Sequence, residues 1–221
     1  DYIRDMEPYE IAQCIGISSK LAVKAALYSY EFPNKSNGLF AIEAFTGDVF
    51  RSMDIPSFTP ETIAFAQERL LIVSSLYGLL FPYDIIKTYR LDYKASCAPS
   101  GDALYSFWKP KLTERLIHHL LLREETEIIN LLPGDAAKCI DWKKIRSIAH
   151  VITPRFIIDD NKITHKTPNS RIIKEMRGYM TNKILLGKLD SISEIESLNT
   201  SRISVLKPLS SSNIIDFIIK H

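Results

Sequence analysis

Residues 15–22 read Ile15-Gly16-Ile17-Ser18-Ser19-Lys20-Leu21-Ala22, and this stretch decides the fold of the N-terminal part of the chain. A short glycine turn joins two amphipathic segments here, because apolar residues recur at helical spacing on both sides of it. The second segment opens with Ser18, a favoured helix cap, and carries Lys20 and Lys24. The stretch therefore predicts two helices joined by a tight turn, which is the layout of a helix-hairpin-helix.

The two predicted helices carry matching apolar faces. Pro8 predicts the start of the first helix, because proline is favoured at the first helical position. The residues that form the two faces are Ile11, Cys14 and Ile15 in the first helix and Leu21, Ala25 and Tyr28 in the second. Gly16 is expected to adopt a positive φ between them.

The turn of such a hairpin is a candidate anion site. The first N–H groups of a helix have no partner within the helix, and the helix dipole makes that end positive, so a nucleic-acid phosphate fits there. We therefore expect contacts to DNA from the turn and the start of the second helix, namely from Gly16, Ile17, Ser18, Ser19, Lys20 and Lys24. The alternative is an αα-hairpin that only turns a corner in the core.

Length and composition indicate one globular domain over residues 1–221, since no segment has the composition of a linker. The chain is 46% hydrophobic and 24% charged. Its apolar runs are too short to cross a bilayer. Its three cysteines, Cys14, Cys97 and Cys139, show no CxxC spacing, which argues against a disulfide framework and a zinc knuckle. We expect a cytoplasmic protein without a membrane partner. The chain begins at Asp1, so we also expect that an N-terminal segment is missing.

The charges are unevenly distributed, although the net charge is only +2. Residues 138–188 contain twelve Lys and Arg against four acids, a local net charge of +8. Such a positive region favours an anionic partner on one face. The alternative is an ordinary solvated surface on which the cations pair with acids.

The hydrophobic pattern predicts a mixed α/β fold. Helices are predicted at residues 60–70, 103–108, 110–122 and 170–186, with a further one after the capping box at Ser191, and strands at residues 71–73, 127–132, 148–158, 163–166, 202–206 and 214–220. The paired strands 148–158 with 163–166, and 202–206 with 214–220, predict hairpins. The fold class is therefore α+β, a mixed sheet with surrounding helices.

A series of short motifs runs along the chain in a fixed order. The motifs are Ala44-Phe45-Thr46-Gly47-Asp48-Val49-Phe50, Leu76-Tyr77-Gly78-Leu79-Leu80, Tyr89-Arg90-Leu91-Asp92, Phe107-Trp108, Ile129-Asn130-Leu131, Asp141-Trp142-Lys143, Val151-Ile152-Thr153-Pro154, Lys174-Glu175-Met176-Arg177-Gly178 and Ser211-Ser212-Asn213. Their order and spacing resemble those of the YaaA family of bacterial peroxide-stress resistance proteins over essentially the whole chain.

The resemblance implies a single α/β domain with a helix-hairpin-helix, a basic cleft, DNA binding, and a role in limiting oxidative damage when iron and peroxide meet. Lys174 and Arg177 lie at i and i+3, where two cations can contact neighbouring phosphates. Arg90 is a further candidate for the cleft. The chain differs from the family pattern in two ways. The opening Ser-Pro-Ala-Lys strand is absent, and the residues at Phe81, Leu132-Pro133-Gly134-Asp135 and Ile172 differ from those usual in the family.

Binding to duplex or structured DNA without sequence specificity is therefore the expected function, because no segment carries base-reading side chains at recognition-helix spacing. The alternative is an enzyme that acts on a small anionic or nucleotide-like substrate in the same cleft, with Tyr77, Asp135 and Lys174 as candidate catalytic residues. We expect no cofactor, and no metal, because the histidines are scattered without ligand spacing.

Overall fold

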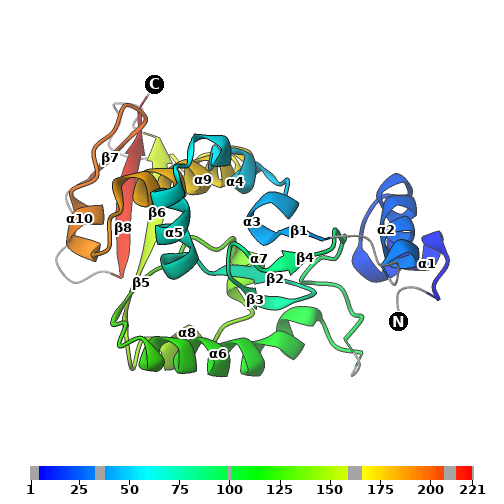
Figure 1. The fold of residues 1–221 in the computed structure, drawn as a ribbon. Helices are drawn as coiled ribbons and strands as arrows, with labels where there is room; N and C mark the ends of the chain where they lie inside the picture. The colour runs from blue at the N-terminus through cyan, green and yellow to red at the C-terminus, as the bar shows by residue number, and fades with distance from the viewer. Residues whose placement is uncertain (1–4, 33–37, 99–100, 159–165, 207–212, 221) are drawn as a thin grey trace. The chain divides into compact units, whose positions relative to one another are not determined.

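The structure, a computed structural model, describes residues 5–32, 38–98, 101–158, 166–206 and 213–220 (Figure 1). These residues divide into two units. The first unit contains residues 1–45, 70–119 and 132–145, and the second contains residues 46–69, 120–131 and 146–221. The fold class is α+β as predicted, with a mixed sheet and surrounding helices.

The first unit begins with the predicted pair of helices. Its helices are α1 (Pro8–Ile15), α2 (Ser19–Glu31), α3 (Ala41–Ala44), α6 (Leu104–Leu122, the last turn of which belongs to the second unit), α7 (Gly134–Ala137) and α8 (Trp142–Ile145). Its strands form two antiparallel pairs, β1 (Leu39–Phe40) with β4 (Ile85–Ile86) and β2 (Ile72–Ser74) with β3 (Gly78–Leu80).

One apolar cluster in this unit joins the helical pair to the chain around α6. It contains Ile11 and Ile15 of α1, Ala22 and Ala25 of α2, and Ala95, Ala98 and Leu104. All seven side chains are at most 6% exposed. The prediction of the α2 face was wrong in detail, because its buried positions are Ala22 and Ala25, whereas Leu21 and Tyr28 are only partly buried. Small side chains at the contact allow the two helices to approach closely.

The second unit contains the larger sheet. Its strands are β5 (Glu127–Ile129), β6 (His150–Ile158), β7 (Ile203–Val205) and β8 (Ile214–Ile219), in the order β5-β6-β8-β7. The pairs β5–β6 and β6–β8 are parallel, whereas β7 runs antiparallel to β8. Its helical segments are α4 (Asp48–Arg51), η1 (Ile55–Ser57), α5 (Pro60–Arg69), α9 (Ser170–Gly187) and α10 (Ile192–Glu196).

Helix α9 packs across one face of this sheet (Figure 1). Met176 and Met180 of α9 lie in one cluster with Ile152, Phe156 and Phe217 of the strands. The helix begins after Asn169, whose side chain accepts a hydrogen bond from the N–H of Ile172 at 3.0 Å. Ser170, where the sequence predicts the helix to begin, is its first helical residue, and Asn169 is its cap. The predicted capping box at Ser191 and Glu194 is present at the start of α10.

The prediction of two consecutive helices at 103–108 and 110–122 was wrong. A single helix, α6, runs through Pro110. Proline removes one helical hydrogen bond at a cost of about 3 kcal/mol, but the chain is fixed on both sides of it. The Trp108 indole N–H donates to the carbonyl of Ser75 at 2.8 Å, and Leu112 is 2% exposed.

The predicted hairpin of strands 148–158 and 163–166 is described only in part. Ile158 forms an antiparallel bridge to Lys166, and residues 159–165 lie outside the described part of the chain. The predicted C-terminal pair is present as β7 and β8, although the residues between them, 207–212, are also outside it. These pairings confirm that the sheet is mixed.

Candidate nucleic-acid interface

The turn between α1 and α2 has the backbone conformation that the sequence predicts. Gly16 has φ 71° and ψ 40°, in the left-handed region that favours glycine. Its N–H and that of Ile17 donate to the carbonyl of Ala12 at 2.9 and 3.1 Å, which closes the end of α1. The chain then enters α2 within two residues.

The start of α2 leaves donors available for an anion. Ser18 is the N-cap residue, but its side chain accepts no capping hydrogen bond, and only its carbonyl bonds to the N–H groups of Leu21 and Ala22. Ser19 and Lys20 occupy the exposed first turn, which contains no acidic residue. The positive helix end is therefore not offset by a carboxylate in its own first turn.

The other predicted cations of the first unit are exposed. Lys24 lies one turn beyond Lys20, with its ammonium 5.5 Å from the centre of the Tyr28 ring. Arg90 lies in the chain between β4 and α6. Within the described ranges, no carboxylate forms an ion pair with any of these three side chains. All three cations are thus available to a solvent-borne anion.

Lys174 and Arg177 lie on successive turns of α9 in the second unit. Lys174 is exposed, whereas Arg177 is half-buried. This burial lowers the pKa of the Arg177 guanidinium from its ordinary value. Among the described residues, no acidic side chain pairs with Arg177. A guanidinium that is partly removed from water without a counter-charge is stabilised by an incoming anion.

Two other cations on the same unit are neutralised. Arg171, one turn before Lys174 on α9, forms an ion pair with Glu175 at 2.9 Å. Arg155 of β6 binds both carboxylate oxygens of Asp216 at 2.6 and 2.7 Å. The excess of positive charge over residues 138–188 is therefore partly paired. Among the described residues, Lys174 and Arg177 form no ion pair, as is also true of Lys143 and Arg146, but Arg177 differs from these in that burial lowers the pKa of its guanidinium.

The three candidate catalytic residues have different surroundings. The Tyr77 hydroxyl accepts a hydrogen bond from the backbone N–H of Lys87 at 3.0 Å, and burial raises the pKa of Tyr77. Asp135 forms ion pairs with Lys94 at 3.1 Å and Lys138 at 3.5 Å, and the bond to Lys94 lowers its pKa. Lys174 lies in the other unit. A shared catalytic role for the three residues stays a prediction.

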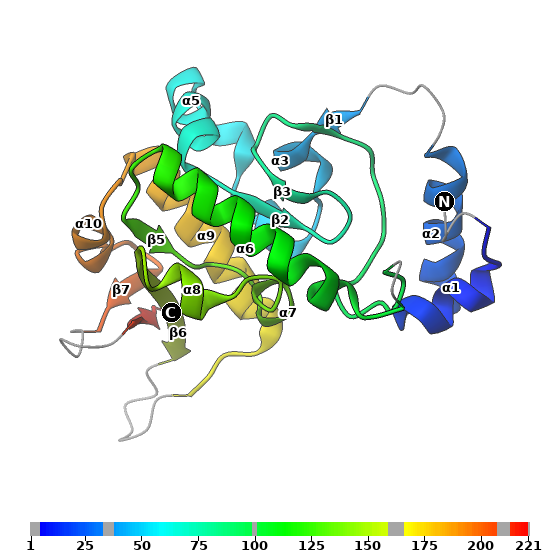
Figure 2. The same cartoon turned by 90° about the horizontal axis from the view of Figure 1, so that it is seen from below.

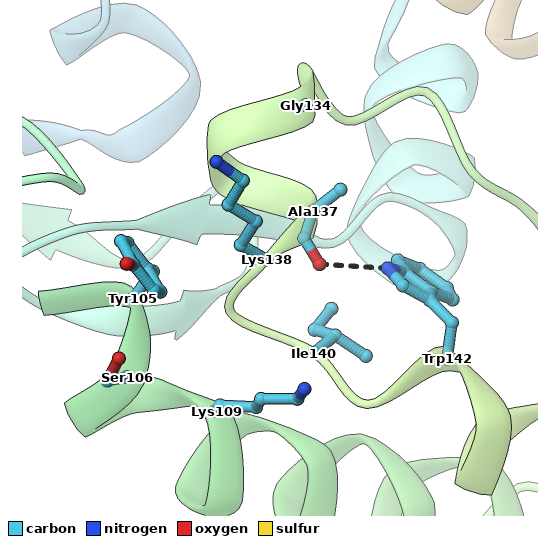
Figure 3. A pocket seen from close by; sticks show the side chains of 8 residues that line it. All are labelled: Tyr105, Ser106, Lys109, Gly134, Ala137, Lys138, Ile140 and Trp142. Carbon is cyan, nitrogen blue, oxygen red and sulfur yellow. Dashed lines mark hydrogen bonds between the residues drawn. The ribbon is translucent and has the colours of Figure 1, made fainter.

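Figure 3 shows a hollow of the first unit, beside α7, that is not among the sites predicted from the sequence. Its volume is about 520 Å³. The residues that line it are Tyr105, Ser106, Lys109, Gly134, Ala137, Lys138, Ile140 and Trp142. The Trp142 indole N–H is used, because it donates to the carbonyl of Ala137 at 2.9 Å. Two lysines beside two aromatic rings fit a phosphate with an attached planar group.

No local motif in the sequence indicates this hollow. Lys109 comes from α6 and Lys138 follows α7, and only the packing of the two elements brings them to one place. The one sequence signal is the i, i+3 spacing of Asp135 and Lys138, which predicts an ion pair but not a hollow.

The structure thus brings the predicted residues together in two groups. Gly16, Ile17, Ser18, Ser19, Lys20 and Lys24 form one hairpin, and Lys174 and Arg177 share one helix. The single cleft that would combine both groups stays a prediction, because the groups belong to different units. Within the described ranges, no three metal-ligating side chains lie close enough to hold an ion, and no helix is long and apolar enough to span a membrane.

The fold and these groups define a mixed α/β protein with an N-terminal helical hairpin and unpaired surface cations. The chain belongs to the YaaA family of peroxide stress proteins, since the family described as peroxide stress protein YaaA matches residues 1–205. The resemblance seen in the motifs is confirmed by this match.

Two relatives illustrate the similarity. A UPF0246 protein of Francisella philomiragia subsp. philomiragia is 31% identical over 219 residues, which cover 97% of this chain and 85% of the relative. A UPF0246 protein of Cellvibrio japonicus is 33% identical over 205 residues, which cover 91% of this chain and 78% of the relative.

Proposed function

We propose that this protein binds the phosphate backbone of duplex or structured DNA without marked sequence preference, as its part in the peroxide stress response. The proposed contacts are the hairpin turn with Lys20 and Lys24, the exposed Arg90, and Lys174 with Arg177 on α9. We also propose a cytoplasmic location, because the protein must be able to reach the DNA that it binds. Membership of the YaaA family supports the stress role.

Arg177 gives the proposal its main support. Its guanidinium is half-buried, and the described residues supply it with no carboxylate. Burial of an unpaired charge costs free energy, and a charge-assisted hydrogen bond to a phosphate oxygen offsets that cost. Exposed Lys174, one turn away, can reach a neighbouring phosphate of the same strand.

The hairpin between α1 and α2 offers a second set of contacts to phosphate oxygens. Backbone N–H groups at the start of α2 and the ammonium of Lys20 both favour an anion. None of these groups reads base edges, which is why the proposal specifies binding that is independent of sequence.

Catalysis is the weaker alternative. The Tyr77 hydroxyl is held by the backbone at Lys87, and the Asp135 carboxylate is held by two lysines. A carboxylate with a lowered pKa is a poor general acid near neutral pH. The hollow beside α7 is instead a further place where a phosphate could bind, through Lys109 and Lys138.

Matched arginine variants test the proposal. Arg177→Gln and Arg155→Gln each remove one guanidinium, but only Arg155 is neutralised, by Asp216. With fluorescently labelled duplexes of two unrelated sequences, Arg177→Gln should weaken binding on the order of tenfold at low salt, equally for both duplexes. Arg155→Gln should bind like the parent. Equal affinities for the parent and a folded Arg177→Gln would place the phosphate contacts elsewhere.

A further inference from the structure

The hollow beside α7 is built from two stretches of the first unit that lie far apart in the sequence. Tyr105, Ser106 and Lys109 come from the start of α6, where spacings of three and four residues place them on one face of the helix. The other lining residues come from α7 and the chain that leads into α8, namely Gly134, Ala137, Lys138, Ile140 and Trp142. Figure 2 shows α7 and α8 along one side of α6. The volume of the hollow, about 520 Å³, lies within the range of small-molecule sites, roughly 300–1,000 Å³.

The charged groups that line the hollow are positive. Of the described residues around it, two are lysines and none is acidic. Among the described residues, no carboxylate forms an ion pair with Lys109. Lys138 lies 3.5 Å from Asp135, but that carboxylate is closer to Lys94, at 3.1 Å. Because an ammonium group has three donors, Lys138 can hold Asp135 and a second anion together. The hollow therefore favours a ligand with negative charge.

Two aromatic rings lie on opposite sides of the hollow (Figure 3). The Trp142 ring is held in place, because its indole N–H donates to the carbonyl of Ala137 at 2.9 Å. The ammonium of Lys138 lies over the Tyr105 ring, 5.6 Å from its centre. Buried Ile140 adds an apolar surface between the two rings (Figure 3). Ring faces beside an aliphatic side chain bind a flat group such as a nucleobase by stacking.

We propose that this hollow binds a nucleoside monophosphate, with its phosphate held by Lys109 and Lys138 and its base stacked on the Trp142 ring. The Ser106 hydroxyl forms no hydrogen bond with the described residues, so it can donate to a phosphate oxygen. A single phosphate fits better than a triphosphate. Triphosphates bind as Mg²⁺ complexes in sites that supply carboxylates, and the lining described here has none.

This inference goes beyond the proposed function and does not depend on it. The residues that line the hollow are different from those proposed to contact DNA. A free nucleotide is the ligand inferred here, because the base must enter the hollow together with its phosphate. The phosphate backbone of a duplex keeps its bases stacked inside the helix and offers only the phosphate.

Isothermal titration calorimetry with AMP tests the inference. AMP should bind, whereas adenosine lacks the phosphate and ribose 5-phosphate lacks the base. Each of these two compounds should bind more weakly than AMP by on the order of tenfold, since a charge-assisted hydrogen bond and a stacked base each contribute at least that much.

Two lysines of α6 provide matched variants. Lys109 and Lys111 are both exposed, but Lys111 does not line the hollow, and its ammonium lies 4.0 Å from the centre of the Phe107 ring. Lys109→Gln should weaken AMP binding by on the order of tenfold and leave adenosine binding unchanged. Lys111→Gln should bind AMP like the parent, and circular dichroism should show that both variants fold.

Fluorescence of Trp142 reports the position of the base. A base stacked on this ring should quench its emission, so AMP should lower the tryptophan fluorescence of the parent. Trp142→Phe keeps a ring for stacking and should still bind AMP in the calorimeter. Its emission should not respond to AMP, because Trp108 is then the only tryptophan of the chain.

The possible outcomes are distinct. The inference is overturned if AMP does not bind, if ribose 5-phosphate binds as tightly as AMP, or if Lys109→Gln and Lys111→Gln bind AMP equally. If AMP does not bind but Lys109→Gln weakens duplex binding, the hollow is a contact to DNA instead. Arg177→Gln tests the DNA proposal separately, and it should bind AMP like the parent.

Discussion

Arg155 and Arg177 show how the surroundings of a guanidinium decide what it can bind. Arg155 is exposed and already holds both oxygens of Asp216. Arg177 is half-buried, and no carboxylate pairs with it in the described part of the chain. The same functional group is held in an ion pair at Arg155, whereas at Arg177 it has no carboxylate partner among the described residues. The sequence alone does not distinguish the two residues, because both lie in one basic segment.

The conformation of a single residue, Gly16, gives a second prediction. A Cβ added at Gly16 would meet no atom within 4 Å, so Gly16→Ala is strained only by its φ of +71°. The variant should lose about 1 kcal/mol of unfolding free energy. It should also lose DNA affinity, since the turn must shift to relieve the strain and the N–H groups of α2 move with it. Urea denaturation and fluorescence anisotropy measure the two effects.

Gly101→Ala is the matched control. Gly101 has φ +78° and equally open surroundings, but it lies outside the hairpin. It should show a similar loss of stability with unchanged DNA affinity. If Gly16→Ala also binds DNA like the parent, the hairpin is only a packing corner.

Asp135 predicts an acid-dependent contribution to stability. Its pKa is lowered in the folded protein, first by the hydrogen bond from Lys94. A carboxylate whose pKa is lower when folded stabilises the fold above its ordinary pKa of about 4, and this contribution is lost as the pH falls through the folded value. Asp135→Asn should therefore be less stable than the parent at pH 7, and the difference should vanish in acid.

Urea denaturation over a series of pH values measures this difference. Asp102→Asn serves as the control, because Asp102 is exposed and forms no ion pair with any described residue. If the difference in unfolding free energy between the parent and Asp135→Asn stays constant down to the lowest pH, the ion pairs of Asp135 do not stabilise the fold.

Helix α9 is held by contacts on two sides. Met176 and Met180 pack against the sheet, and Gly178 faces α4. A Cβ at Gly178 would lie 2.0 Å from the carbonyl oxygen of Val49, which is backbone and cannot rotate away. This glycine therefore lets α4 lie directly on the helix that carries Lys174 and Arg177.

Gly178→Ala should accordingly destabilise the protein by about 1–3 kcal/mol or more, because α4 must move away from α9. Gly134→Ala is the control, since a Cβ at Gly134 would meet nothing within 4 Å. Thermal denaturation followed by circular dichroism compares the two. A Gly178→Ala variant as stable as Gly134→Ala would show that the close approach of α4 is unimportant.

The sequence predicts most elements but few of their contacts. Helical spacing and caps identify α1, α5, α9 and α10, because these signals are local. Pro110 misled the prediction, since a helix interior tolerates proline only where tertiary contacts such as the Trp108 hydrogen bond fix both sides. The pairing state of Arg155 and Arg177 and the hollow beside α7 both depend on residues far apart in sequence, so no local pattern predicts them.

For the whole molecule, the proposed phosphate contacts come from two units. The hairpin with Lys20 lies in the first unit, and α9 with Arg177 lies in the second. If the two sets contact different phosphates, their contributions to binding should add. The effect of Lys20→Gln combined with Arg177→Gln should then equal the product of the two single effects on the dissociation constant.

The salt dependence of DNA affinity is the sharpest test of the proposed binding to the phosphate backbone. Each phosphate contact that releases a counterion lowers log K by about 0.9 for each unit of log salt concentration. In a plot of log K against log salt concentration, the slope of the parent should correspond to several phosphate contacts and should be the same for unrelated duplexes. Arg177→Gln and Lys20→Gln should each reduce the size of this slope by about one. An affinity that does not change with salt, or the absence of binding at low salt, would contradict binding to the phosphate backbone.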